Sequence, residues 1–316
     1  MQTKNFTSVS EFFLEGLSKN RNTEILLFIL ILIIYVLALV GNLVIILLVH
    51  VDSCLHTPMY FFLSNLSGLE ISYVTSTVPQ MLAHLLSENR TISFTRCIAQ
   101  MYIATSLGST ECMLLGVMAY DRYLAICSPL LYAVSMNRGR QWQLATVSWA
   151  GGFLCTTMDV IATLQFPICR ANRINHFFCE VPMLLKLACG NTQITEFVIF
   201  VVAVVILLVP LSVILISYGL ILSSVLQMKS AAGRSKAFST CASHLVVVTL
   251  FFGTAIFVYM KPQSSTSGDF DKKTAVFYII VTPLLNPIIY TLRNKDVHAA
   301  VAKVLRRQAL GKKVEL

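Results

Sequence analysis

The chain has 316 residues, of which 56% are hydrophobic and only 12% are charged, and its formal net charge is +9. Soluble domains carry roughly a quarter charged residues, so the composition excludes a pair of soluble domains, although the length would allow two. The basic excess is weak evidence for nucleic-acid binding, since lysine and arginine beside apolar spans are ordinary membrane-topology signals. We expect lipid to be the solvent for most of the chain, and no nucleic-acid partner.

The first 23 residues are polar and precede the first long apolar run. No small-residue cleavage site follows that run, so we expect a signal anchor rather than a cleaved signal peptide. Residues 1–23 are therefore expected to form an extracellular N-terminus. The sequon Asn5-Phe6-Thr7 agrees with this side and makes Asn5 a candidate glycosylation site, with Asn89-Arg90-Thr91 as a second sequon close to the bilayer.

A helix needs about 20 apolar residues to cross the hydrocarbon core. Seven stretches meet this requirement and define a receptor-sized unit over residues 24–292. The first and fifth are clear from hydropathy alone, whereas the second, third and seventh contain polar residues and should face protein or water on one side. The predicted spans are 24–50, 58–86, 96–127, 140–163, 196–226, 237–260 and 272–292.

Seven spans place the two termini on opposite sides of the membrane. With the N-terminus outside, 13 of the 24 lysines and arginines lie on the cytoplasmic side, which favours this orientation by a small margin. We therefore predict a multi-pass plasma-membrane protein with a cytoplasmic segment over residues 293–316. Within residues 294–307, apolar residues recur at helical spacing between basic ones, which predicts an amphipathic helix on the inner leaflet.

Cysteine placement indicates disulfides rather than a zinc site. No CxxC pair occurs among the nine cysteines, which argues against structural zinc. Four cysteines fall on the predicted extracellular side, an even number that suggests two disulfides with three possible pairings: Cys97, Cys169, Cys179 and Cys189. The other five are expected to be small packing residues: Cys54, Cys112, Cys127, Cys155 and Cys241.

Two charged features lie within the spans. Asp121 and Arg122 lie at the inner end of the third span. Arg122 follows Cys97 by 25 residues, about 37 Å along a helix. Arg122 is either an ion-pair switch or a residue that extends to the head groups. Glu70 and Glu111 are expected at mid-membrane, where acids are costly. We expect them to share a sodium ion or a proton, with Asn42 and Asn286 as polar partners; the alternative is two acids hydrogen-bonded separately.

Several strings together resemble the signature of vertebrate odorant receptors. They are Met118–Cys127 (MAYDRYLAIC), Pro58–Ser67 (PMYFFLSNLS), Ser217-Tyr218, Lys236–Leu245 (KAFSTCASHL) and Pro283–Tyr290 (PLLNPIIY). The resemblance covers essentially the whole chain and favours the class II, tetrapod-type branch. It implies an all-α membrane protein, a rhodopsin-like seven-transmembrane helix bundle with a short amphipathic C-terminal helix.

The resemblance also assigns roles to individual residues. It selects the pairings Cys97–Cys179 and Cys169–Cys189, which would hold the long loop between spans four and five as a lid. It places Glu70, Glu111, Asn42 and Asn286 in the sodium-site region, although the family more often has aspartate where this chain has Glu70. The implied G-protein switch comprises Asp121, Arg122, Tyr123, Tyr218, Asn286, Pro287 and Tyr290.

A ligand pocket is implied in the outer half of the bundle. Its lining is small, apolar and hydroxylic: Ala104, Thr105, Gly108, Ser109, Cys112, Val202, Ala203, Ile206, Phe252, Ala255, Ile256, Tyr259 and Ile279. Ala104 stands where amine receptors carry an acid, so a cationic ligand has no obvious counter-ion there and a neutral volatile ligand is expected. Asp159, near the outer end of the fourth span, is the one acid that could change this expectation. Phe252 replaces the family's usual tyrosine. For any single position, ordinary helix packing is the competing interpretation.

The function implied is that of an odorant receptor without enzyme activity. A small volatile ligand would shift the bundle toward a state that activates a stimulatory olfactory-type G protein and raises cyclic AMP. No cofactor is expected apart from the possible sodium ion. Two alternatives stay open: a receptor of the same family for a metabolite outside the olfactory epithelium, and an ion channel or transporter using Glu70 and Glu111, against which the absence of evident internal repeats argues.

Overall fold

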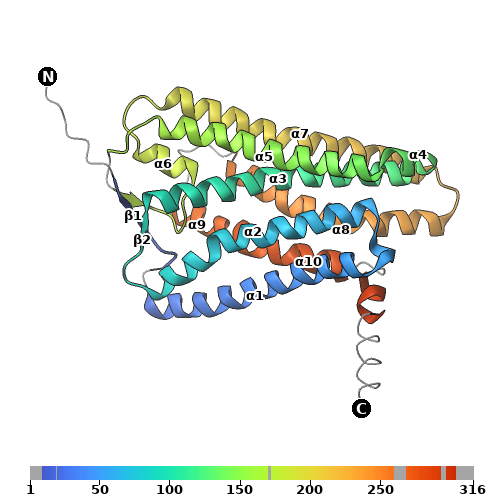
Figure 1. Cartoon of the computed structure of the whole chain (residues 1–316), viewed down its shortest axis with the longest axis horizontal. Helices are drawn as coiled ribbons and strands as arrows, with labels where there is room; N and C mark the ends of the chain where they lie inside the picture. The colour runs from blue at the N-terminus through green and yellow to red at the C-terminus, as the bar shows by residue number, and fades with distance from the viewer. Residues whose placement is uncertain (1–8, 19, 170–171, 260–267, 293–296, 304–316) are drawn as a thin grey trace, which may run out of the picture.

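A computed structural model of the chain describes residues 9–18, 20–169, 172–259, 268–292 and 297–303. Long helices lie side by side along the longest axis of the molecule (Figure 1). The elements in chain order are β1 (Glu11–Leu14), α1 (Arg21–Val51), the 3-10 turn η1 (Ser53–Leu55), α2 (Pro58–Leu86), β2 (Thr91–Ser93), α3 (Phe94–Cys127), α4 (Pro129–Ser135), α5 (Arg138–Leu164), β3 (Arg173–Ile174), α6 (Val181–Leu187), α7 (Gln193–Leu226), α8 (Ala231–Tyr259), α9 (Gly268–Val276), the π-helical turn η2 (Phe277–Val281) and α10 (Thr282–Leu292). Residues 297–303 are also helical.

Membrane-spanning character differs among the helices. Within the residues that the structure describes, five helical stretches are long and apolar enough to cross a bilayer: α1, α5, α7, Cys241–Val258 of α8, and Lys272–Tyr290 through α9, η2 and α10. The 29-residue α2 and the 34-residue α3 are equally long but more polar. Both run through the middle of the bundle, where their buried polar side chains Glu70 and Glu111 are shielded from lipid.

Close approaches between helices depend on small residues on α3, α5 and α1. A Cβ added to Gly152 of α5 would lie 2.9 Å from the Ser106 carbonyl oxygen of α3, and one added to Gly116 of α3 would lie 3.2 Å from Pro210 of α7. Glycine at such contacts lets two helix backbones pack closely. Because α3 packs against α2, α5 and α7, it forms the centre of the bundle and can present side chains to several helices at once.

The polypeptide leaves regular α-helical geometry just before Pro283. The turn Phe277–Val281 is π-helical, and proline cannot donate to the helical ladder. The amide of Asn42 on α1 donates to the Pro283 carbonyl at 3.2 Å and to the Ala38 carbonyl at 3.0 Å. Asn42 therefore joins α1 to α10 through the backbone at the distorted turn.

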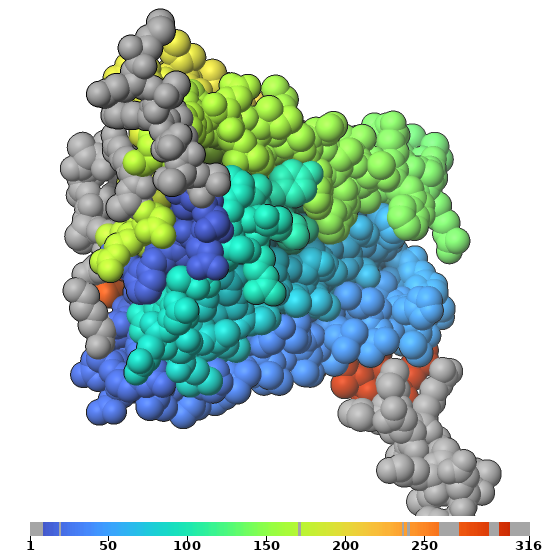
Figure 2. Space-filling view, turned by 60° about the vertical axis from the view of Figure 1, so that its left-hand side comes forward, coloured from blue at the N-terminus to red at the C-terminus, as the bar shows by residue number. Residues whose placement is uncertain are grey.

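A small three-stranded sheet lies at one end of the bundle, which we call the sheet end. The opposite end, where α4 lies, is called the α4 end (Figure 1). Strand β1 lies between its partners, antiparallel to β2 with Glu11 opposite Ser93, and parallel to β3 with Phe13 opposite Arg173. Figure 2 shows the dark blue N-terminal residues seated between the teal start of α3 and the yellow-green segment that carries β3. Phe12 and Leu14 point into a buried cluster with Cys97 and Cys179, so the strand closes this end of the bundle.

Candidate functional site

Two disulfides fasten the segment between α5 and α7 at the sheet end. Cys97 pairs with Cys179, with 5.5 Å between Cα atoms, and Cys169 pairs with Cys189, with 5.8 Å between Cα atoms. Both distances suit a disulfide. The structure therefore has the two pairings that the family resemblance selected from three. The first ties this segment, the lid, to the start of α3.

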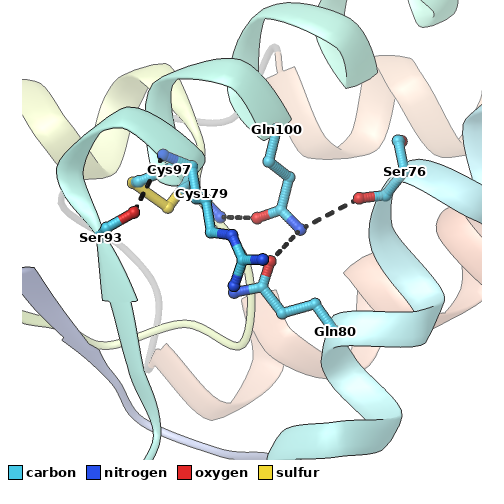
Figure 3. The surroundings of a disulfide bond; sticks show 7 residues. Ser76, Gln80, Ser93, Cys97, Gln100 and Cys179 are labelled. Carbon is cyan, nitrogen blue, oxygen red and sulfur yellow. Dashed lines mark hydrogen bonds between the residues drawn. A yellow bond between two sulfur atoms is a disulfide. The ribbon is translucent and has the colours of Figure 1, made fainter.

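Gln100, one helical turn after Cys97, adds a second attachment (Figure 3). Its side-chain oxygen accepts a hydrogen bond from the Cys179 backbone N–H at 3.1 Å. Its side-chain nitrogen donates to Oε1 of Gln80 at 3.3 Å and to the Ser76 carbonyl at 3.4 Å, both on α2. A single buried side chain thus joins the lid, α3 and α2.

Aromatic residues of the lid reach into the bundle. The rings of His176, Phe177 and Phe178 contact one another, His176 stacked on Phe177 and edge-to-face with Phe178, and all three are buried. Burial and the nearby Lys272 ammonium lower the pKa of His176 to about 3, so the ring is neutral at physiological pH. Phe177 and Phe178 belong to the same apolar cluster as Ala104 of α3. The lid therefore contributes aromatic side chains to the apolar interior of the bundle.

Seven of the predicted pocket residues belong to the large apolar cluster that fills the interior of the bundle. They come from α3, α7, α8 and η2: Ala104, Cys112, Ile206, Phe252, Ala255, Ile256 and Ile279. Val202 and Ala203 of α7 are half-buried and stand outside this cluster. The side chain of Tyr259 lies outside the described residues, so its predicted contribution is untested.

Space and free hydroxyl groups occur at the middle of this region. A Cβ added to half-buried Gly108 would meet no atom within 4 Å, so α3 faces open volume there. Thr105 and Ser109 lie within one turn of Gly108, and within the described part of the chain neither hydroxyl has a hydrogen-bond partner. Asp159 of α5 is buried, and its carboxylate likewise has no partner among those residues. An apolar wall with unpaired hydroxyls suits a small ligand of low polarity.

Buried polar groups of α2, α3 and α10 converge deeper in the bundle. The Asn286 amide donates to Oε1 of Glu70, and the Glu70 and Glu111 carboxyl groups are close enough to share a hydrogen bond. Three oxygen atoms here are buried without a hydrogen-bond partner in the described structure: Glu70 Oε2, Glu111 Oε1 and Asn286 Oδ1. The structure thus brings together three of the four predicted residues, whereas the amide of Asn42 bonds to backbone carbonyls instead.

Several of the predicted switch residues lie toward the α4 end, whereas Asn286 bonds to Glu70 deeper in the bundle. The Tyr218 hydroxyl hydrogen-bonds Nδ1 of His244 at 2.7 Å, joining α7 to α8. The Arg122 guanidinium interacts electrostatically with Tyr218 and with Tyr290 of α10. Its Nε is buried without a partner among the described residues. One cation on α3 therefore interacts with tyrosines of two other helices, α7 and α10.

Asp121 has a partner that the sequence did not indicate. The hydroxyl of Tyr132 on α4 donates to its carboxylate at 2.8 Å. Asp121 makes no ion pair with Arg122 in the described part of the chain. Burial and the adjacent Asp121 charge raise the pKa of Tyr132 above its ordinary value, so its hydroxyl stays protonated and able to donate.

The predicted amphipathic helix is described over residues 297–303. Val297 and Ala300 are buried against the bundle, and Lys303 pairs with Asp52 at 2.9 Å. Asp52 also accepts a hydrogen bond from the Cys54 backbone N–H at the start of η1. These contacts, above all the one with Lys303, lower the pKa of Asp52 below its ordinary value.

Comparison with known proteins decides the family. A family model described as olfactory receptor matches residues 31–308. The chain belongs to the olfactory receptor family. It is 52% identical over 307 residues to human olfactory receptor 2D2, covering 97% of this chain and 99% of that protein. It is 50% identical over 301 residues to human olfactory receptor 2G3, covering 95% of this chain and 97% of that protein.

A mouse relative and a solved structure extend the comparison. Mouse olfactory receptor 2C1 is 48% identical over 305 residues, covering 96% of this chain and 98% of that receptor. The crystal structure of squid rhodopsin superimposes with a TM-score of 0.71 at 17% identity, covering 91% of this chain and 86% of rhodopsin. The expected rhodopsin-like, all-α fold is confirmed. The olfactory receptor described here is thus a membrane receptor of the G-protein-coupled class and not an enzyme.

Proposed function

We propose that this olfactory receptor binds a small, neutral volatile molecule among α3, α7, α8 and η2, beneath the lid. The open space at Gly108 supports this placement most directly, because Gly108 lies within one helical turn of Thr105 and Ser109, whose hydroxyls have no hydrogen-bond partner in the described structure. An apolar wall holds the body of a ligand, and one or two hydroxyls orient it.

Binding there would be transmitted to the α4 end through α3 and α8. Phe252 of α8 belongs to the apolar cluster around the proposed pocket, and His244 lies about two turns further along the same helix, bonded to Tyr218. A ligand that fits an outward position of α8 better would weaken the Tyr218–His244 contact and release Tyr218 toward Arg122. The partner we propose is a stimulatory olfactory-type G protein, which raises cyclic AMP.

We place the sheet end outside the cell and the α4 end in the cytoplasm. Both disulfides lie at the sheet end, and disulfides persist in oxidising compartments. The α4 end carries basic residues such as Arg138 and Arg140 of α5, in keeping with the positive-inside rule. Asn5, the candidate glycosylation site, precedes the described residues.

We also propose a sodium ion or a proton between Glu70 and Glu111. The residues present fit such a group, because three buried oxygens there have no partner among the described residues and each could contact a cation or a proton. A sodium ion would supply positive charge that offsets two facing carboxylates. Held by Glu70, Glu111 and Asn286, it would stabilise the inactive arrangement of α2, α3 and α10.

A cell-based cyclic AMP screen tests the proposed ligand class. The receptor, displayed at the cell surface, is exposed to a panel that matches neutral volatiles with amines and carboxylic acids of similar size. Responses confined to neutral compounds would support the proposal, whereas a response led by amines would point to Asp159 as a counter-ion and overturn it. Transcript levels across tissues would separate a nasal receptor from one for a metabolite elsewhere.

A further inference from the structure

A groove lies on the outer surface between α2 and α3 at the sheet end, separate from the proposed odorant pocket. Its free volume is about 790 Å³, within the range of small-molecule sites. Side chains at helical spacing line it: Thr75, Ser76, Pro79, Gln80, Ala83 and His84 from α2, and Arg96, Ala99, Gln100 and Ile103 from α3. Thr91–Ser93 and Glu11 close its end.

The lining changes character along the helices. His84 and Arg96 lie within one turn of the sheet-end termini of α2 and α3, which is the depth of lipid head groups. Deeper along the same faces are Pro79, Ala99 and Ile103, all exposed in the protein and small or apolar. The groove is therefore charged where the membrane surface lies, and deeper it offers an apolar strip for an acyl chain beside the hydroxyl and amide groups of Thr75, Ser76 and Gln80.

Two opposite charges stand at the polar end without being paired. Glu11 of β1 and Arg96 of α3 both border the groove, and neither makes an ion pair with any residue that the structure describes. Strand pairing fixes Glu11 opposite Ser93, the N-cap of α3, whose side chain accepts from the Arg96 N–H. A cation and an anion are thus held next to the same opening by regular structure.

The polar side chains at the floor of the groove already have hydrogen-bond partners within the protein. Gln80 and Gln100 bond to each other, and Gln100 also bonds to Ser76 and Cys179 (Figure 3). A ligand therefore has no reason to break this network and would be recognised by the charges at the rim. A site with one guanidinium and one carboxylate suits a zwitterion, because each charge of the ligand then has an opposite partner. A simple anion would pair with the guanidinium alone and would be repelled by the carboxylate.

We propose that this groove binds a zwitterionic phospholipid, with its phosphate at Arg96, its ammonium group at Glu11, and one acyl chain along Pro79, Ala99 and Ile103. The choice of a zwitterionic head group rests partly on the proposed orientation, because anionic lipids gather in the cytoplasmic leaflet. A lipid seated here would contact β1, α2 and α3 together. It would link the closed sheet end to the surrounding membrane.

Photolabelling tests the site without an odorant or a G protein, so its outcome does not depend on the proposed ligand. The full-length receptor is placed in nanodiscs containing photoactivatable phosphatidylcholine with a diazirine near the glycerol, and labelled peptides are mapped. We expect labelling concentrated on residues 75–84 and 91–103. Arg96→Gln should reduce that labelling about fivefold, the effect of losing one partly exposed ionic contact, and Ala99→Phe should reduce it by filling the groove.

Arg140→Gln is the matched control. Arg140, like Arg96, is the third residue of its helix, and its backbone N–H is likewise capped by the residue preceding the helix. It lies at the α4 end and should leave labelling unchanged. Glu11→Gln should shift competition in favour of anionic phosphatidylglycerol. Labelling spread evenly over the lipid-facing surface of α7, or unchanged in Arg96→Gln, would overturn the proposal.

Discussion

The hydroxyl of Tyr132 donates a hydrogen bond to Oδ1 of Asp121, with 2.8 Å between the two oxygens. Asp121 is buried at the α4 end of α3, whereas Tyr132 belongs to the short helix α4. The bond therefore fixes α4 against the end of the helix that carries Arg122.

Removing this hydroxyl should lower stability. Tyr132→Phe leaves the buried Asp121 carboxylate with one hydrogen-bond partner fewer, which lowers the free energy of unfolding by about 1.5 kcal/mol. We expect the melting temperature in detergent to fall by about 3 °C, measured by thiol-reactive dye fluorescence. Tyr120→Phe is the control, because the Tyr120 hydroxyl has no hydrogen bond in the described structure. Equal shifts in the two variants would contradict the role given to Tyr132.

Filling the open space on α3 should abolish odorant binding without unfolding the receptor. Gly108→Leu adds a side chain where no atom lies within 4 Å, so the fold accepts it while the ligand loses its volume. We expect no odorant response at concentrations up to at least about tenfold above the half-maximal concentration of the unmodified receptor, at unchanged surface expression. Gly219→Leu is matched, because Gly219 has equally free surroundings but is exposed on α7. If only Gly219→Leu weakened the odorant response, the proposed location of the pocket beside Gly108 would be contradicted.

Sodium sensitivity should depend on Glu111. If a cation offsets the two buried carboxylates, adding sodium lowers basal nucleotide exchange of the unmodified receptor. Glu111→Gln removes one charge and should make basal exchange insensitive to sodium. Glu196→Gln, which changes an acid in the first turn of α7 bonded to Thr192, should behave as the unmodified receptor does. An unchanged basal rate and sodium response in Glu111→Gln would exclude the shared-cation interpretation.

Acid should release the helix at residues 297–303. The pKa of Asp52 is lowered in the folded receptor relative to its ordinary 3.8, chiefly by its bond to Lys303. Stabilisation by the pair is therefore complete above pH 3.8 and is lost as pH falls through the lowered value. Hydrogen exchange over 297–303, corrected for intrinsic rates, should be steady from pH 7 to about pH 5 and accelerate only well below pH 4.

The control for acid release is Lys303→Met, which lacks the ionic partner. In this variant the exchange rate over 297–303 should already be raised at neutral pH and should change little on acidification. Asp52→Asn should give the same raised rate, because it breaks the pair from the other side. A steep acid response that persists in Lys303→Met would assign the transition to a different carboxylate.

Hydropathy carries information about the helices because the bilayer demands long apolar stretches. The structural bounds differ mainly where helices continue beyond the lipid: α8 begins at Ala231, whereas the predicted span begins at residue 237. The intervening residues 231–236 (AAGRSK) are small or basic, and helical geometry does not require them to be strongly apolar. Hydropathy thus marks where a helix meets hydrocarbon rather than where it ends.

Contacts between short segments that are far apart in the chain could not be predicted from the sequence. Strand β1 has four residues, and its partners lie about 80 and 160 positions away; the alternation of Phe12 and Leu14 was the only local sign. Nothing in the string around Tyr132 indicated Asp121 as its partner. The family motifs supplied the predicted pocket lining, which stays a prediction, whereas the three-way bond of Gln100 depends on how the lid folds back.

The measurement that tests the central claim most directly is odorant-dependent nucleotide exchange on a purified stimulatory olfactory-type G protein, using the reconstituted receptor and a volatile found by the screen. The account predicts faster exchange with the odorant in the unmodified receptor and in Gly219→Leu, none in Gly108→Leu, and no odorant-dependent current in a planar bilayer. A current carried by the receptor without any acceleration of exchange would contradict it.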